Sequence, residues 1–92
     1  MPYFVVSYDY SAPESDLATV RREHRDYLAA LDELVVSGPA ASGRAAFLVF
    51  RADTAEQVEA IVAADPFVAA GYVGQHTVRD WNPVLGSLAD QF

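Results

Sequence analysis

The sequence contains no cysteine and no lysine in its 92 residues. Without cysteine the chain has no disulfide, no thiolate ligand for a metal and no cysteine nucleophile, although this absence assigns no compartment. Its six strongly cationic side chains are all arginines, and 13 Asp and Glu residues bring the net charge to −7. Phosphate backbones and anionic lipids repel a chain this acidic, so we expect neither nucleic acid nor a membrane surface as a partner.

Long hydrophobic runs and cofactor motifs are also missing. No apolar segment is long enough to span a membrane, and no signal-peptide pattern is present, so we expect a cytoplasmic protein. The two histidines, His24 and His76, form none of the spacings HxH, HxxxH or HExxH, and neither GxGxxG nor GxxxxGK occurs. We therefore predict no metal site and no cofactor.

Apolar side chains are abundant, at 52% of the chain, and aromatic residues make up 12%. A disordered acidic tail would lack enough apolar surface to offset the entropy of ordering, so this chain is expected to fold. Its length suits one domain with one modest core. We predict a domain over residues 1–81 and a C-terminal tail over residues 82–92.

Alternating and β-branched residues predict four strands. The segments 3–10 and 44–51 carry the strongest signals, and the second of these has the continuous apolar centre of a central strand. A weaker strand is expected over 35–40, and the last strand over 72–81, after a short turn at 67–70.

Apolar residues spaced three and four apart predict two helices. The first runs from Leu17 to near Leu34, and a serine of the preceding SAPES segment is expected to cap it. The second begins at a capping box over residues 53–56, and its inward-facing stripe ends at Asp65.

The resulting order, βαββαβ, is that of a ferredoxin-like α+β fold, with an antiparallel sheet and both helices on one face. The strands are apolar on both sides, so the second sheet face needs a cover. We expect that cover to be a second copy, in a homodimer packed sheet to sheet. Four apolar tail residues are expected to dock on the partner: Val84, Leu85, Leu88 and Phe92.

His24 is the first candidate for chemistry, because helical spacing places it on the core-facing stripe. An imidazole there can exchange a proton with a bound ligand near neutral pH. The alternative is a buried neutral histidine bonded to a backbone carbonyl.

Asp65 is the second candidate, at the point where the chain turns at Pro66. Its carboxylate can orient a nearby imidazole and stabilise the charged form. The alternative is structural, because Asp followed by Pro is a common helix start with Asp as the cap.

Arg21, Arg22 and Arg25 form a local cationic cluster in this acidic chain. Arginine suits planar anions, so Arg21 is a candidate to bind a carboxylate or phenolate of a small substrate. For Arg22 and Arg25 we favour a solvated helix face with neighbouring charge pairs, such as Arg22 with Asp26.

Weaker candidates for substrate binding are Tyr8, Ser37 and Phe67. Tyr8 can equally be a core aromatic residue with a paired hydroxyl, and Ser37 an ordinary turn residue. The Phe67 side chain can instead occupy the pocket itself and leave no room for a ligand. His76 is read as a surface residue of the last strand.

Several of these residues, in this order and spacing, resemble the YCII-related (YciI-like) family over residues 3–81. The matching pieces are Arg21-x-x-His24, Gly38-Pro39, Asp65-Pro66-Phe67-x-x-Ala70-Gly71 and the closing Trp81. The resemblance implies a dimeric α+β barrel in which His24 and Asp65 form an active-site dyad. It also implies chemistry on small cyclic or aromatic acids, which in one branch is dehydrochlorination of a chlorinated hydroxyquinol.

Three functions follow as hypotheses. The first is a cofactor-independent enzyme for isomerisation or elimination, in which His24 is the acid/base, Asp65 orients it and Arg21 or Tyr8 holds an anionic ring. The second is a module of the same fold that binds a small metabolite without changing it. The third is a purely structural dimer whose pocket is filled by its own side chains.

Overall fold

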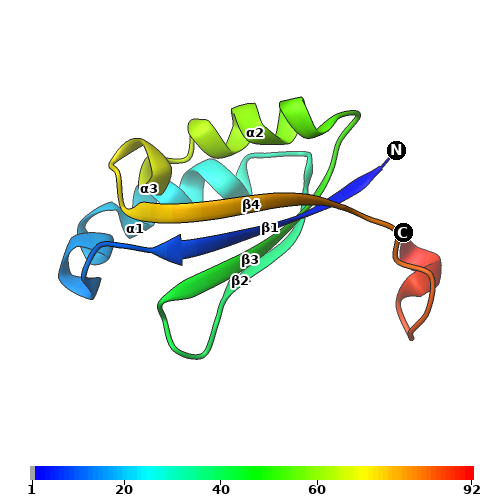
Figure 1. The fold of residues 1–92 in the computed structure, drawn as a ribbon, viewed down its shortest axis with the longest axis horizontal. Coiled ribbons are helices and arrows are strands. Elements are labelled where there is room, and N and C mark those ends of the chain that lie inside the picture. The colour runs from blue at the N-terminus through cyan, green and yellow to red at the C-terminus, as the bar shows by residue number, and fades with distance from the viewer. Residues whose placement is uncertain (1) are drawn as a thin grey trace.

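The computed structural model describes residues 2–92, and these form a four-stranded antiparallel sheet with helices packed on one side of it (Figure 1). The strand order is β2-β3-β1-β4. The elements are β1 (Tyr3–Tyr10), α1 (Glu14–Ala29), β2 (Leu34–Pro39), β3 (Ala45–Arg51), α2 (Ala55–Ala63), α3 (Pro66–Ala69), β4 (Val73–Trp81) and a 3₁₀ turn, η1 (Ala89–Gln91). The predicted βαββαβ order and α+β class are confirmed.

The core lies between the sheet and the helices. In each central strand, buried and more exposed side chains alternate, as the sequence predicts. In β1, Phe4, Val6 and Tyr8 are buried toward the helices, while the residues between them are half-exposed on the other face. From β3, Leu48 and Phe50 join them in the same cluster. The helices complete it with Leu28 of α1 and with Val58 and Val62 of α2.

Helix α1 is shorter than predicted, since it ends at Ala29 and Leu34 already belongs to β2. The apolar spacing continues past the helix because Leu31, in the turn, and Leu34, in the strand, both pack against the same core. The cap also differs from the prediction. Pro13 occupies the N-cap position, and no side chain caps the helix. The spacing of apolar residues therefore indicates which side chains are buried, but it does not indicate where the helix ends.

The second helix begins within the predicted segment 53–56, with Thr54 as the cap accepting a hydrogen bond from the Gln57 backbone N–H. The Gln57 side chain accepts from the Asp53 N–H at 3.0 Å, so residues 54 and 57 fix this helix start, one position later than the predicted 53–56. The predicted turn at 67–70 is a one-turn helix, α3, capped by Asp65 with Pro66 at its first position. The chain then reverses at Gly71, whose φ is +79°.

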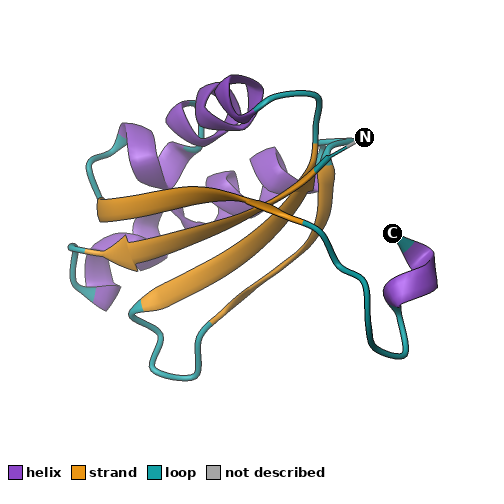
Figure 2. Ribbon diagram, turned by 45° about the vertical axis from the view of Figure 1, so that its right-hand side comes forward, coloured by secondary structure: helices purple, strands orange, loops and turns teal. Residues whose placement is uncertain are grey.

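Beyond Trp81 the tail leaves the sheet and ends in η1 (Figure 2). Phe92 returns to contact Tyr3 and Trp81, with ring centroids 5.0 and 5.8 Å apart. Several other apolar side chains remain exposed on the tail and on the helix-free face of the sheet, among them Leu85, Leu88, Val36 and Phe47. Within the described residues, no helix has the length and apolarity needed to cross a bilayer.

Candidate active site

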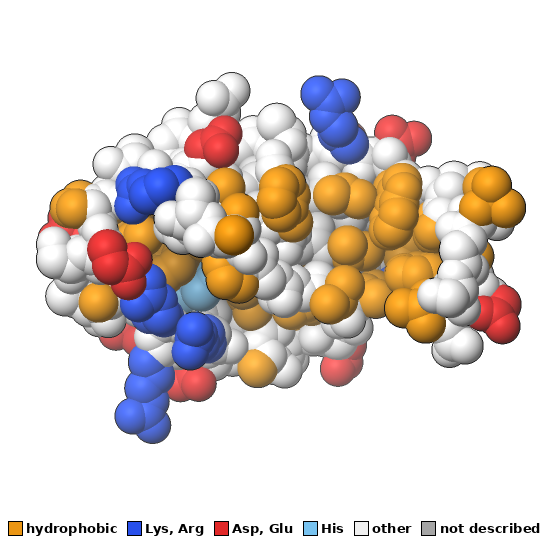
Figure 3. Space-filling view, turned by 90° about the horizontal axis from the view of Figure 1, so that it is seen from below, with side chains coloured by type: hydrophobic (Ala, Val, Ile, Leu, Met, Phe, Trp, Pro, Cys, Tyr) orange, Lys and Arg blue, Asp and Glu red, His pale blue; other side chains and the backbone are white. Residues whose placement is uncertain are grey.

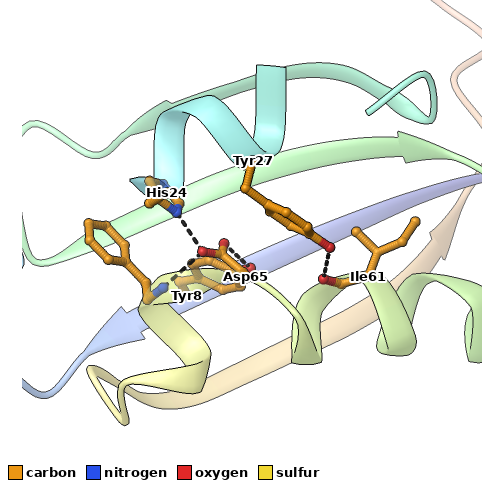
Figure 4. A network of polar contacts seen from close by, with 6 residues as sticks. Tyr8, His24, Tyr27, Ile61 and Asp65 are labelled. Atoms are coloured by element: carbon orange, nitrogen blue, oxygen red, sulfur yellow. Dashed lines mark hydrogen bonds and ion pairs between the residues drawn. The ribbon is translucent and has the colours of Figure 1, made fainter. Parts of the chain in front are cut away.

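His24 and Asp65 meet at the boundary between the core and the surface. His24 comes from the inward face of α1, and Asp65 from the residue that precedes α3. Nδ1 of His24 lies 2.7 Å from Oδ1 of Asp65 (Figure 4). The side chain of Asp65 is fully buried, whereas that of His24 is 12% exposed. The pair therefore points from the interior toward solvent.

Three donors hold the Asp65 carboxylate in place. Besides His24, the Phe67 N–H donates to Oδ1 at 3.0 Å, and the Tyr8 hydroxyl donates to Oδ2 at 2.9 Å. A buried carboxylate is costly unless its oxygens accept hydrogen bonds, and here both do. Asp65 thus caps α3 and orients His24 at the same time, so the structural and functional interpretations of this residue are compatible.

Tyr8 remains a hydrogen-bond donor across the working pH range. Burial and the adjacent Asp65 carboxylate raise the pKa of its phenol far above the usual value. A phenol that stays protonated can donate to Oδ2 of Asp65 throughout.

The imidazole of His24 is fixed by a second contact, a stack on the ring of Phe67. The ring centroids are 3.9 Å apart and the planes differ by 10°. Because a carboxylate only accepts hydrogen bonds, Nδ1 carries the hydrogen shared with Asp65. In the neutral imidazole, Nε2 then has the free lone pair and can accept a proton.

His24 opens into a cleft of about 960 Å³ between α1 and the β2–β3 hairpin. Its apolar walls include Leu28, Leu34 and Leu48, and the hairpin loop 40–43 forms one rim. This volume lies in the range of sites for small molecules.

The cleft is locally positive in an acidic protein. Three of the six arginines line it, Arg21, Arg25 and Arg44, against one acidic residue among the described lining residues, Glu14. Figure 3 shows arginine side chains grouped around a histidine at one end of the molecular face that it draws. Arg21 pairs with Glu14 at 2.5 Å, so part of this charge is neutralised. A net attraction for anions remains.

Four of the predicted site residues line the cleft: His24, Arg21, Ser37 and Phe67. Ser37 faces it because it pairs with Leu48, which is buried on the helix side of the sheet. Tyr8 does not line it. Tyr8 is instead a buried core aromatic residue, and its hydroxyl donates a hydrogen bond to Asp65 from the interior.

His76 and Arg22 lie away from the cleft. His76 contacts Glu59 at 3.2 Å on the β4 and α2 side, and Arg22 is exposed on α1. The favoured interpretation of Arg25 as part of a solvated face was incomplete, because this exposed residue also lines the cleft.

Sequence reasoning missed Tyr10 and Arg44, which also line the cleft. Tyr10 ends the first strand on the face that points to the helices, and Arg44 directly follows the hairpin loop 40–43. One signal could have indicated Arg44: it directly follows a tight turn, and residues next to such loops often take part in binding.

Among residues 2–92, no three His, Asp or Glu side chains gather closely enough to hold a metal ion. The polar groups that line the cleft include instead the imidazole of His24, the hydroxyls of Tyr10, Ser37 and Ser42, and the arginines.

Comparisons with known proteins agree with the fold. The model of the YCII-related domain matches residues 1–82. The chain is similar to 5-chloro-2-hydroxyhydroquinone dehydrochlorinase (TftG) from Burkholderia phenoliruptrix AC1100, solved in complex with 2,5-dihydroxybenzoquinone. The two share 25% identity over 88% of this chain and 93% of the other, with a TM-score of 0.73.

Protein Atu4242 from Agrobacterium tumefaciens has a similar fold, with a TM-score of 0.57 and 16% identity over 90% of this chain and 93% of that one. A comparison with curated protein sequences gave no significant match. The family match spans nearly the whole chain, including His24 and Asp65, and the chain therefore belongs to the YCII-related domain family.

Proposed function

We propose that this protein is a cofactor-independent enzyme that uses His24 and Asp65 for acid/base chemistry on a small cyclic or aromatic acid. The observation that carries the proposal is the 2.7 Å contact from Nδ1 of His24 to a buried carboxylate, with the imidazole open to the cleft. A histidine held in this way can act as a general base through Nε2 and then as a general acid.

Isomerisation or elimination fits these groups. Nε2 of His24 takes a proton from a ring carbon, and the C–H electron pair forms a new π bond. In an elimination, the leaving group on the next carbon departs with its bonding pair. In an isomerisation, an adjacent π bond breaks instead, and its electron pair takes the proton back from His24 at a different atom. Asp65 stabilises the imidazolium formed in the first step, because its charge lies next to Nδ1.

Two observations support a ring-bearing anionic substrate. The cleft combines apolar walls with arginines, which suits a planar acid. The similar enzyme TftG is named as a dehydrochlorinase and was solved with a hydroxylated quinone. The alternative is a module that binds such a metabolite without changing it.

The deciding experiment compares turnover by the wild type, His24→Gln and Asp65→Asn, with His76→Gln as the matched control outside the cleft. Chlorinated hydroquinones are assayed by chloride release, and unsaturated lactones by absorbance. We expect His24→Gln to reduce the rate by about 100-fold or more and His76→Gln to leave it unchanged, since acid/base groups contribute on this scale.

Equal rates in the wild type and His24→Gln would contradict the proposal. Recovery of every bound compound unchanged after long incubation would favour the binding module.

We also propose that the protein works as a cytoplasmic homodimer, with the helix-free sheet faces packed together and the 82–92 tail docked on the partner. Phe47 and Val36 support this arrangement, because their side chains are 54% and 58% exposed on that face. Leu85 and Leu88 on the tail are more exposed still, at 92% and 64%. Exposed apolar surface of this kind is typical of interfaces.

A further inference from the structure

Arg44 is held at the rim of the cleft by two backbone carbonyls. Its Nη2 donates to the Tyr10 oxygen at 3.0 Å and to the Ala12 oxygen at 2.6 Å. Both acceptors are uncharged, and Arg44 forms no ion pair with any carboxylate of residues 2–92. The guanidinium is therefore fixed in position while its full charge is retained.

The hairpin loop sets the position of Arg44. The Gly43 N–H donates to the Ala40 oxygen at 2.9 Å, and Gly43 has a φ of +73°. The backbone N–H of Arg44 itself donates to the Ser42 hydroxyl at 3.1 Å. Arg44 is thus anchored at its backbone and at its side chain, so a ligand would not have to order it.

The other two arginines of the cleft are less suited to bind an anion. Arg21 already pairs with the Glu14 carboxylate. Arg25 is exposed and makes no hydrogen bond or ion pair with the residues that the structure describes, so binding would have to immobilise its side chain. In Arg44, Nη2 is engaged, and Nη1 and Nε make no hydrogen bond within residues 2–92.

We infer that Arg44 is the anion anchor of the cleft: it binds the carboxylate of a ring-bearing ligand and makes the site select acids over uncharged analogues of the same shape. The inference rests on the proposed function only in placing the ligand in the same cleft. Nη1 donates a charge-assisted hydrogen bond to the carboxylate, and the apolar walls contact the ring.

A purely structural role for Arg44 makes a different prediction. Its two carbonyl contacts tie the β3 end of the hairpin to the last residue of β1, Tyr10, and to Ala12 in the segment between β1 and α1. Loss of such a tie would weaken the binding of charged and uncharged ligands alike. Loss of an anion anchor weakens the binding of the acid alone.

The test measures the Kd of 2,5-dihydroxybenzoate and of its uncharged amide, 2,5-dihydroxybenzamide, by calorimetry or NMR titration. The proteins are the wild type, Arg44→Gln, Arg44→Lys and, as a matched control, Arg22→Gln, which removes an exposed arginine of α1 outside the cleft. We expect the wild type to bind the acid more tightly than the amide.

Arg44→Gln is expected to raise the Kd of the acid about tenfold or more, the usual scale for a charged hydrogen bond, and to change that of the amide less than twofold. Arg44→Lys keeps the positive charge and should retain more of the preference for the acid over the amide than Arg44→Gln does. Arg22→Gln should bind both ligands as the wild type does. Equal loss of both ligands in a folded Arg44→Gln variant would overturn the inference, as would a wild type that binds the acid no better than the amide.

Salt dependence provides a second measurement on the unchanged protein, should Arg44→Gln not fold. Raising NaCl from about 0.05 M to about 0.5 M shortens the screening length, so the preference for the acid should shrink. A preference that does not depend on salt would count against an exposed cationic anchor.

The same experiment separates this inference from the proposed function. Acid binding that depends on Arg44, without turnover of any ring compound, supports the anchor and contradicts the enzyme. Turnover that depends on His24, without a preference for acids, supports the enzyme and overturns the anchor.

Discussion

Tyr8 donates to Oδ2 of Asp65, while His24 and Phe67 donate to Oδ1, so both carboxylate oxygens are held from different elements. The buried hydroxyl of Tyr8 is therefore the remote support of the site, since it contacts neither solvent nor the cleft. Removing one donor from such a buried set leaves an acceptor without a partner.

Tyr8→Phe should lower the free energy of unfolding by about 1–3 kcal/mol, because Oδ2 of buried Asp65 loses its donor. Urea denaturation followed by circular dichroism measures the change. Tyr3→Phe is the control, since Tyr3 is half-buried beside the Phe92 ring and its hydroxyl makes no hydrogen bond with the described residues. Equal effects of the two substitutions would show that the Asp65 contact adds nothing to stability.

Alkaline pH should destabilise the fold through its tyrosines. Burial, followed by the Asp65 carboxylate, raises the pKa values of Tyr8, Tyr10 and Tyr27 above the usual 10.0. The folded protein then keeps phenolic protons that the unfolded chain releases, so stability declines as pH rises above about 10. Urea unfolding at a series of pH values should show this decline, with a shallower slope in Tyr8→Phe. A pH-independent stability between about pH 9 and 11 would contradict the expectation.

At the scale of elements, the one-turn helix α3 connects fold and site. Asp65 begins α3 by accepting the Phe67 N–H, and the same helix brings the Phe67 ring against His24. The cap and the dyad thus share one side chain, and a substitution at Asp65 changes both.

Asp65→Asn and Asp65→Ala should separate these two roles. Asn is nearly as good an N-cap as Asp, so Asp65→Asn is expected to be more stable than Asp65→Ala by about 1 kcal/mol. Both substitutions remove the negative charge next to His24, and both should therefore reduce any turnover that depends on His24. Thermal or urea unfolding checks the stability, and equal stability of the two variants would show that the cap is not needed.

At the scale of the whole molecule, the helices cover one face of the sheet and leave the other bare (Figures 1 and 2). A sheet that exposes Phe47, Val36 and Trp81 resembles one half of an interface. The homodimer that we propose would bury this surface in both copies.

Phe47→Asp should convert a dimer to monomers, because a charge buried in an apolar interface has no partner. Sedimentation velocity measures the change. Ala60→Asp is the control, since it adds the same charge on an exposed position of α2, on the opposite side of the sheet.

Removal of residues 83–92 should weaken the dimer if the tail docks on the partner. A monomeric wild type would contradict the proposed assembly.

Sequence alone determined the features that depend on neighbours along the chain. Strand alternation in β1, the start of α2 near residues 53–56 and the Asp65-Pro66 start of α3 follow from local hydrogen bonding and from the direction of successive side chains. The same periodicity placed His24 on the inner face of α1.

Tertiary structure alone decided the contacts between distant residues. Tyr8 lies beneath Asp65, 57 positions away in the chain, because β1 is central in the sheet and α3 packs near its end. Arg44 lies at the cleft because the β2–β3 hairpin brings it to the carbonyls of Tyr10, at the end of β1, and of Ala12. Helix α1 stops at Ala29, and the apolar period runs on because helix, turn and strand each bury leucines in one core. Periodicity reports burial, and only the assembled sheet and helices determine which buried groups meet.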